Sequence, residues 1–581
     1  DVYKRQHHAL LIRVTTEHGQ VPSNLEPYLP VDGLAYHWGF HSLSAAAISI
    51  SGGIIPLQLP EAMLWHSFML QVLVVLTCAG LALALWQRRL AGLIALAIVG
   101  LGSIMPAFYL SWGRTTLLTG VMLLPGLMLL SYQLMRHPAW RSALVLAFAM
   151  AGLSLTHLPT FVFALAWCLA VGCSTLWLNG NIQPGAGELP AYILAFPFSP
   201  KIQAYKQLSE TGLSNGSAIQ APGTPRLQKK NMGSLASLAS SRPGGLGALQ
   251  TDSKAHFFQA WVYVQLLFAS LMLAGLAQLP WLLLLLKRAR PGTGSSALHV
   301  AGNTSYNAMP IGLLWAIGND MLLALAALAA LFSILRRRHI SALILLWCTL
   351  ALLLANPVMI GLPYISFVTN EVLVVCLFIP AALLIGGACS IVAEAIEQRW
   401  SRARHVEVFF AILTLVWAIW RVPAFQSVVN PDTIITTADD MTAVRWATSG
   451  TPADARFLVN TTGWLGPVDR GSDGGWWLLP IAGRQVSTPP VVYTYAPDAI
   501  VTQVQADTAW LRAAGKADDV TIAAFMRQHA YSYVFATQHG TTLNSERLRA
   551  SPLFEEVYAN TTVSILPVSY THLTLPTNRE V

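Results

Sequence analysis

The residue types that could do chemistry are concentrated between His7 and Ala46, a polar segment rich in histidine and aromatic side chains. His8 lies near the start of this segment, and Asp32, His37 and His41 follow. A carboxylate with nearby imidazoles can act as a general base or bind a divalent cation. We therefore predict catalytic roles for Asp32, His8 and His41, and substrate binding by His37. The alternative is an interfacial loop whose aromatic side chains lie at the lipid headgroups while its histidines are only solvated.

Other polar residues occur at the ends of apolar runs. Arg13 follows His8 by five positions, about 140° around a helix, so spacing alone does not place both on one face. Arg114, in a Ser-Trp-Gly-Arg turn, suits bidentate phosphate binding but could equally be an interfacial arginine beside tryptophan. His157, in a Leu-Thr-His-Leu-Pro hairpin, either faces the same site or packs between helices. We predict substrate binding by all three; Glu371 is explained by the start of a helix, where a carboxylate is favoured.

These side chains must be positioned by membrane helices. Of the 581 residues, 54% are hydrophobic and only 11% are charged, whereas an ordinary soluble domain has about 25% charged residues. The net charge of +8 comes in short clusters, without the basic stripe typical of nucleic-acid binding. All six cysteines lie in apolar stretches, so no disulfide framework is expected. The composition excludes a water-soluble globule, and nucleic acid is not an expected partner.

A helix needs roughly 20 apolar residues to cross a bilayer. By this criterion the sequence predicts about ten spans, preceded by a first helix that is absent from this chain. The predicted spans are Met63–Trp86, Leu90–Tyr109, Thr116–Leu134, Ser142–Thr156, Thr160–Trp177, Phe257–Leu286, Ile311–Leu335, Ser341–Ile360, Val372–Ala395 and Val406–Trp420.

Clusters of arginine in short loops mark the cytoplasmic side. Four such clusters fall on one side if the spans alternate, which places residues 7–62 and the C-terminal region on the opposite, external side. A fifth cluster, Lys287–Arg290, then falls outside, so either the preceding span is miscounted or the cluster binds an anionic ligand. Residues 179–256 are rich in Gly, Ser and Pro and predict a long loop, partly disordered or re-entrant.

After Pro423 the composition becomes that of a soluble α/β domain. Short apolar runs predict strands, and helical spacing predicts the helices between them. The predicted strands are Arg456–Val459, Tyr531–Ala536, Thr562–Leu566 and, more weakly, Gln485–Thr488; the predicted helices are Asp439–Ser449, Ala506–Ala514 and Val520–His529. The run Trp464–Arg484 combines Gly, Trp and Asp, as in sugar-binding surfaces, although Trp476 and Trp477 could instead be core or docking residues.

Both ends differ in composition from what they flank, and we expect them to be foreign to the protein. The predicted organisation is therefore a foreign N-terminus (1–6), an external loop with the candidate site (7–62), five spans (63–178), a loop (179–256), five spans (257–422), an external α/β domain (423–568) and a foreign C-terminus (569–581).

Several short motifs, taken in order, resemble the GT-C superfamily of membrane glycosyltransferases. They are His-Ala-x-x-Ile-Arg at His8–Arg13, Gly-Phe-His at Gly39–His41, Ser-Trp-Gly-Arg at Ser111–Arg114, Leu-Pro-Gly at Leu124–Gly126, Leu-Thr-His-Leu-Pro at Leu155–Pro159, Trp-Trp-Leu-x-Pro-x-x-Gly-Arg at Trp476–Arg484 and Tyr-Val-Phe at Tyr533–Phe535. The pattern is most similar to the prokaryotic group labelled 6-pyruvoyl-tetrahydropterin-synthase-related membrane proteins, a label that does not imply pterin chemistry.

The resemblance implies sugar transfer from a polyprenyl-phosphate-linked donor to an acceptor on the external face of a prokaryotic plasma membrane, often with a divalent metal ion. In the superfamily the first external loop carries a catalytic acid shortly after the first helix. That position would lie just before His7, so the resemblance leaves Asp32 as a second candidate and an inactive fragment as an alternative to an active enzyme. A non-catalytic protein, such as a lipid-linked sugar flippase or polymer-export component, is the alternative; no internal repeat typical of transporters is found.

Overall fold

The computed structural model of the chain describes residues 5–33, 36–52, 58–177, 246–288, 307–316, 319–336, 338–362, 368–400, 405–429, 434–465, 467–515 and 517–568. The predicted loop 179–256 lies outside these residues up to 245, and its last part belongs to helix α10 (Leu246–Ala277). The predicted foreign C-terminus also lies outside them.

Within the described residues, five helical segments are long and apolar enough to cross a membrane. They are α3 (Leu59–Trp86), α6 (Thr115–Arg136), the apolar part of α10, α16 (Asn370–Val375) together with α17 (Phe378–Arg399), and α18 (Val406–Arg421) continued by η5 (Val422–Val428). Shorter apolar helices are α4 (Arg89–Ala97), α7 (Trp140–Thr156), α8 (Leu158–Trp177), α14 (Asn319–Leu335) and α15 (His339–Ala355). Each predicted span overlaps one of these segments, which confirms a mostly helical chain with several apolar helices.

Several predicted spans are interrupted in the structure, and proline lies at the interruptions. The predicted span Leu90–Tyr109 becomes α4, a π-helical turn η1 (Ile98–Gly102) and, after Pro106, the short helix α5 (Ala107–Ser111). Proline cannot donate the hydrogen bond that a helix interior requires, and its ring clashes with the preceding turn. For the same reason α10 stops before α11 (Leu279–Arg288), which has Pro280 in its first turn, and α15 stops before η4 (Pro357–Ile360). Within the predicted span Ile311–Leu335 the structure describes α13 (Ile311–Ala316) and α14.

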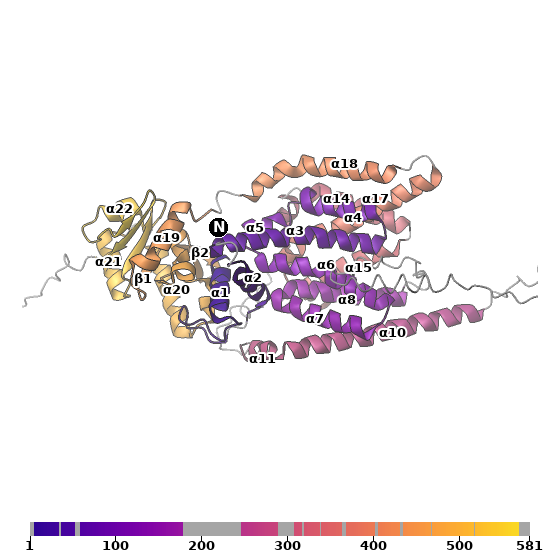
Figure 1. The fold of residues 1–581 in the computed structure, drawn as a ribbon, viewed down its shortest axis with the longest axis horizontal. Helices are drawn as coiled ribbons and strands as arrows, with labels where there is room; N and C mark the ends of the chain where they lie inside the picture. Colours follow the sequence, from indigo (N-terminus) through magenta and orange to yellow (C-terminus); the bar gives the residue numbers. More distant parts are fainter. Residues whose placement is uncertain are drawn as a thin grey trace, which may run out of the picture. The chain divides into compact units, whose positions relative to one another are not determined.

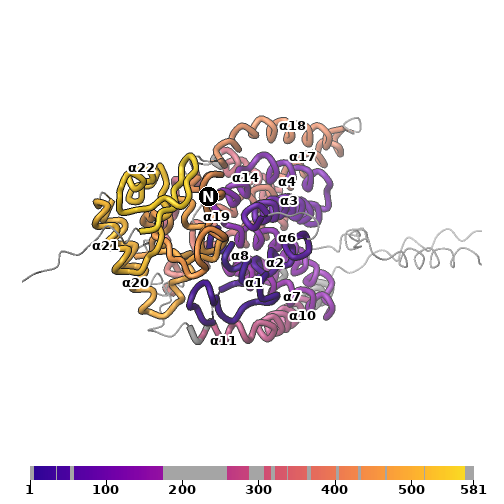
Figure 2. The backbone as a smooth tube through the Cα atoms, turned by 60° about the vertical axis from the view of Figure 1, so that its left-hand side comes forward, coloured from indigo at the N-terminus to yellow at the C-terminus, as the bar shows by residue number. Residues whose placement is uncertain are grey.

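Close approach of backbones holds the apolar helices together. Helices α3, α6 and α7 run side by side (Figures 1 and 2). A Cβ added at Gly386 of α17 would lie 2.7 Å from the carbonyl oxygen of Ala91 in α4, so only glycine allows this contact. Trp86 of α3 donates from Nε1 to the carbonyl of Leu383 in α17 at 2.9 Å. Helix α17 therefore contacts α3 and α4 directly.

Helix α18 lies along the outside of the bundle (Figure 2). Ala418 is its one buried residue, whereas Phe409, Val416 and Trp420 are more than half exposed. An apolar face of this size is stable only against lipid or another apolar surface. Together with the long apolar helices, this describes a multi-pass membrane protein.

The segment predicted as a loop over 7–62 is instead largely helical. It contains α1 (Arg5–His18), α2 (Gly39–Ser51) and the first turn of α3. The sequence does not predict α1 as a helix. The four consecutive residues Ala9 to Ile12 are all fully buried, so the helix lacks the one-sided apolar stripe typical of a surface helix. Helix α1 begins at Arg5, inside the hexapeptide that we expected to be foreign.

The chain has a second compact unit, Gly172–Val264. Its described residues are the last turns of α8 and the first half of α10. A Cβ added at Gly172 would lie 3.5 Å from the ring of Tyr263, which is fully buried. The two helices of this unit therefore pack closely at that point.

The C-terminal region is an α/β domain, as predicted. Its main sheet has the order β4-β1-β5-β7-β6; β1 is parallel to β4 and β5, and β7 is antiparallel to β5 and β6. The strands are β1 (Arg456–Val459), β4 (Gln485–Val486), β5 (Tyr533–Thr537), β6 (Tyr558–Ala559) and β7 (Val563–Pro567). The predicted strands and helices are confirmed, the latter as α19 (Ala438–Gly450), α20 (Asp498–Ala513) and α21 (Asp519–Gln528). The hairpin β2–β3 (Thr461–Leu465, Val468–Gly471) and the short helix α22 (Ser545–Arg549) were not predicted.

A buried carboxyl group lies where β1 and β5 end. Asp473 accepts hydrogen bonds from Asn460 Nδ2 (2.7 Å), Thr537 Oγ1 (3.0 Å) and the backbone N–H of Gly475 (3.0 Å). Burial outweighs these bonds and, helped by the negative charge of Asp440, raises the pKa of Asp473 to about 7. The folded state therefore binds a proton at this site that the unfolded chain releases near its ordinary pKa of 3.8.

We expect Asp473 to make the stability of this domain fall as the pH rises from about 4 to about 7, and to leave it constant above that. A shift of this size corresponds to about 4 kcal/mol. In Asp473→Asn the dependence should disappear, whereas Asp454→Asn, which changes an exposed turn, should keep it. Pulse proteolysis of the full chain in urea at pH 5 and pH 8 measures the difference; equal stability of wild type at both values would contradict it.

Candidate functional site

Two buried histidines are hydrogen-bonded to each other where α1 meets α2. Nδ1 of His8 and Nε2 of His41 are 2.8 Å apart, and both side chains are almost fully buried. The ring of His7 lies 4.0 Å from that of His8 and bonds the hydroxyl of Tyr36 at 3.3 Å. The ring of His37 stacks on Tyr36 at 4.2 Å. These five side chains are called the histidine site below.

The histidine site is positioned by helices that are far apart in the sequence. A Cβ added at Gly39 would lie 2.3 Å from Oγ1 of Thr156, so α2 begins directly against the end of α7. His157, between α7 and α8, meets the ring of His37 edge-on at 6.1 Å. Trp281 of α11 donates to the carbonyl of Tyr36 at 2.8 Å. The structure thus brings together four of the predicted residues: His8, His37, His41 and His157.

Burial controls the protonation of the histidine site. It lowers the pKa of His41 well below the ordinary value, helped by the neighbouring His37 and His7, and it raises the pKa of Tyr36 well above 10. His41 is therefore neutral at pH 7 and too weakly basic to be the best proton acceptor. As a neutral ring hydrogen-bonded to His8, it is suited to fixing the tautomer and orientation of that histidine.

Arg114 lies at the start of α6. It forms an ion pair with Glu371 at the start of α16, and its guanidinium lies 5.1 Å from the ring of Trp112. Arg5, at the start of α1, donates to the carbonyl of Leu110 in the same α5–α6 connection. Two guanidinium groups thus contact one short segment, residues 107–114, and Glu371 has a partner that the sequence did not predict.

Three asparagines hold the start of α16. Asn356 and Asn370 donate to each other's Oδ1 atoms at 2.7 and 2.9 Å. Asn370 also donates to Asn307, from its backbone N–H to Oδ1 and from Nδ2 to the carbonyl, both at 2.7 Å. The amide of Asn370 is almost fully buried, so the network fixes the residue next to Glu371.

Replacing Asn370 by Ala should destabilise the chain by about 1 to 3 kcal/mol, because it removes a buried amide and leaves the half-buried amides of Asn307 and Asn356 without these partners. Thermal unfolding of the purified chain in detergent measures this. Thr349→Ala on the neighbouring α15 removes an exposed hydroxyl that bonds only its own helix, and it should change stability by less than about 0.5 kcal/mol. If the two variants unfold alike, the network does not stabilise the helix start.

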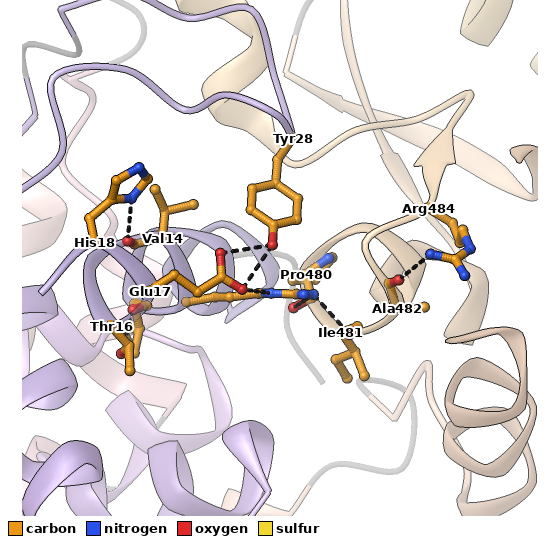
Figure 3. Close-up of polar contacts among 11 residues, drawn as sticks. Val14, Thr16, Glu17, His18, Tyr28, Pro480, Ile481, Ala482 and Arg484 are labelled. Atoms are coloured by element: carbon orange, nitrogen blue, oxygen red, sulfur yellow. Dashed lines mark hydrogen bonds and ion pairs between the residues drawn. The ribbon is translucent and has the colours of Figure 1, made fainter. Parts of the chain in front are cut away.

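Arg13 points away from the histidine site. Its Nη1 donates to the carbonyls of Pro480 and Ile481 in the C-terminal domain at 3.1 and 2.8 Å, and its Nε donates to Glu17 at 2.8 Å (Figure 3). Helical spacing explains the separation, since His8 and Arg13 leave α1 in different directions. The structure therefore does not bring Arg13 to the other predicted substrate-binding residues.

Asp32 is exposed and also lies outside the cluster. Its backbone forms an isolated bridge with Asn24, and within the described part of the chain its carboxylate makes no hydrogen bond or ion pair. Among the described residues, no three His, Cys, Asp or Glu side chains converge on a point that could hold a metal ion. The residues present thus do not fit the divalent cation that the resemblance implies, and no chemical step is assigned to one.

No protein-family model and no curated relative matches the chain. It is similar to solved structures of the oligosaccharyltransferase of the archaeon Archaeoglobus fulgidus. The structure tethered to an acceptor peptide containing the NVT sequon is 13% identical, with a TM-score of 0.49; the match covers 99% of this chain and 71% of that one. The structure of that enzyme, AglB, with an inhibitory peptide and a dolichol-phosphate, and the structure of the apo form, are each 14% identical with the same coverage, at TM-scores of 0.46 and 0.47.

The tryptophans of the predicted sugar-binding run belong to the core of the C-terminal domain. Trp476 and Trp477 are both 1% exposed. A Cβ added at Gly471 would lie 2.4 Å from Trp476, so the indole packs directly on β3. The docking role falls instead to the next turn, η8 (Leu478–Ala482), which Arg13 contacts. The sequence could not predict this contact of Arg13, because the acceptors are backbone carbonyls, which every residue has.

Proposed function

We propose that the chain is a GT-C-like glycosyltransferase that transfers a sugar from a polyprenyl-phosphate-linked donor to an acceptor on the external face of a prokaryotic plasma membrane. The observation that carries the proposal is the buried His8–His41 pair beside His157. Buried and coupled imidazoles are costly in a purely structural role and are typical of proton transfer. The motifs quoted above support the narrower assignment to the 6-pyruvoyl-tetrahydropterin-synthase-related group.

In the proposed reaction an acceptor oxygen attacks C1 of the sugar and the bond between C1 and the phosphate oxygen breaks. The proton of the acceptor passes to His8, which His41 orients, and the electron pair of the broken bond leaves with the polyprenyl phosphate. Arg114 stabilises the charge that develops on this phosphate. His37 and His157 are proposed to bind the sugar, and the exposed Asp32 to contact substrate from the solvent side.

The proposed lipid substrate would meet a small apolar hollow between the helices. It is lined by Phe163, Trp347, Cys348, Ala351, Leu373, Cys376, Leu377 and Pro380 from α8, α15, α16 and α17. Such a surface suits an isoprenoid chain, which has no hydrogen-bonding groups. The proposal also includes about ten membrane crossings, with residues 7–62 and 423–568 outside.

The test uses the full chain in sealed lipid vesicles with undecaprenyl-phosphate-linked, radiolabelled glucose or mannose and extracted envelope acceptors. Wild type should move label from the lipid to the acceptor fraction, and His8→Ala should not. Label that crosses the bilayer while still attached to its lipid would overturn the proposal and favour a flippase. Label that stays on the lipid without crossing would overturn it as well.

A further inference from the structure

The guanidinium of Arg13 joins two parts of the fold that are more than 460 residues apart in the sequence. Through Nη1 it bonds the carbonyls of Pro480 and Ile481, which lie at the end of η8. The last carbonyls of a helical turn lack partners within the turn and carry partial negative charge. Because Arg13 donates to two of these carbonyls at once, it supplies the hydrogen-bond partners that this end of η8 lacks.

Two side chains orient Arg13 for this contact. Glu17, one turn later in α1, accepts a bond from Nε of Arg13 at 2.8 Å. It also accepts the hydroxyl proton of Tyr28, whose oxygen lies 2.9 and 2.8 Å from the two carboxylate oxygens. The ring of Tyr28 lies 4.8 Å from the guanidinium carbon of Arg13. Burial and the carboxylate of Glu17 raise the pKa of Tyr28 to about 12, so its hydroxyl stays a donor at neutral pH. We call Arg13, Glu17 and Tyr28 the clamp.

Residues of the C-terminal domain lie directly against the clamp. Gly483 has φ of +70°, and a Cβ there would lie 3.6 Å from the ring of Tyr28 and 3.7 Å from Nη2 of Arg13. Arg484 donates to the carbonyls of Ala482 and Thr448, which ties η8 to α19. Gln485 donates to the carbonyl of Tyr28 at 2.9 Å. These bonds hold η8, the turn that Arg13 contacts, in place.

We propose that Arg13 is a positioning residue whose clamp docks the C-terminal domain on α1 and thereby fixes the first turn of α1, which carries His7 and His8. His8 precedes Arg13 by about 7.5 Å along the helix axis, a distance over which a hydrogen-bonded helix is rigid. A second link lies at the site itself, because Tyr495 of the domain is near enough to Tyr36 to raise its pKa. The inference rests on the proposed function only in treating the histidine site as the reacting centre.

The test compares Arg13→Ala, Arg13→Lys and Arg445→Ala in the full chain in detergent. Arg445 is an exposed arginine of the C-terminal domain that bonds only its own helix, so it controls for loss of charge. Hydrogen exchange should rise about tenfold or more in residues 5–18 and 478–486 of Arg13→Ala, since bonds to a charged group are lost. The exchange rates of Arg13→Lys should lie between those of wild type and Arg13→Ala, because an ammonium cannot span both carbonyls in the same way. The exchange rates of Arg445→Ala should match those of wild type.

A second readout reports the histidines themselves. Modification of His7 and His8 by diethylpyrocarbonate, followed by mass spectrometry, should accelerate in Arg13→Ala and not in Arg445→Ala. If Arg13→Ala does not fold, Glu17→Gln should produce a smaller rise, about two- to fivefold, in the same two segments, as expected for loss of one orienting ion pair. Unchanged exchange and unchanged histidine modification in a folded variant would overturn the proposal. Neither readout requires transfer, so an inactive wild type with an intact clamp would contradict the proposed function alone.

Discussion

His8→Ala should lower sugar transfer by about 10²- to 10⁴-fold, the usual contribution of a positioned base. His8 is almost fully buried and bonded to His41 at 2.8 Å. His41 cannot replace it as the base, because burial lowers the pKa of His41. Initial rates with a polyprenyl-phosphate-linked sugar, at saturating donor, measure the loss.

His41 should act through His8, and the two losses should therefore not add. We expect His41→Gln to lose less than His8→Ala, since an amide can still bond the imidazole, and His8→Ala/His41→Gln to be no slower than His8→Ala alone. His18→Ala is the matched control: this histidine is on the same helix, is exposed and bonds only the carbonyl of Val14. A double variant much slower than either single variant would show that the histidines act independently.

Arg114→Ala should lower the rate of transfer by about 10²- to 10³-fold, as expected for loss of a group that stabilises a developing charge. The ion pair with Glu371 and the nearby Trp112 hold the guanidinium in one place. Because the charge on the leaving phosphate develops mainly in the transition state, kcat should fall more than KM rises. Steady-state rates over a range of donor concentrations separate the two constants.

Arg136→Ala controls for charge on the same helix. Arg136 lies in the last turn of α6, where its guanidinium is 6.0 Å from the ring of Tyr132. We expect its removal to change the rate by less than about twofold, because this end of the helix is a full membrane thickness from Arg114. Equal losses in both variants would mean that Arg114 contributes only to folding or insertion.

The membrane helices could be predicted because each carries its signal in its own residues. Runs such as Met63–Trp86 are apolar over a bilayer thickness, and the structure has α3 there. Their interruptions at Pro106, Pro280 and Pro357 were not predicted, because the length of an apolar run alone predicts one continuous helix. The strands β1, β5 and β7 were also predictable from short apolar runs, whereas the β2–β3 hairpin lacked a regular apolar pattern.

The candidate site was predicted less completely, because its geometry depends on tertiary contacts. The types and order of His8, His37, His41 and His157 indicated a cluster, and the structure brings these four together. Nothing in the spacing could show that Arg13 points to backbone carbonyls of residues 480 and 481, or that Glu371 pairs with Arg114. The helical form of residues 5–18 was not predicted, because the consecutive apolar residues Ala9 to Ile12 are all buried and leave no one-sided apolar stripe.

The most direct measurement compares the two products of one turnover. Purified wild-type chain in vesicles, given undecaprenyl-phosphate-linked sugar and acceptor, should release one undecaprenyl phosphate for each sugar that appears on the acceptor. His8→Ala should release neither, while His18→Ala should match wild type. Undecaprenyl phosphate released equally by wild type and His8→Ala, or a donor that stays intact with wild type under all conditions, would contradict a glycosyltransferase built on the histidine site.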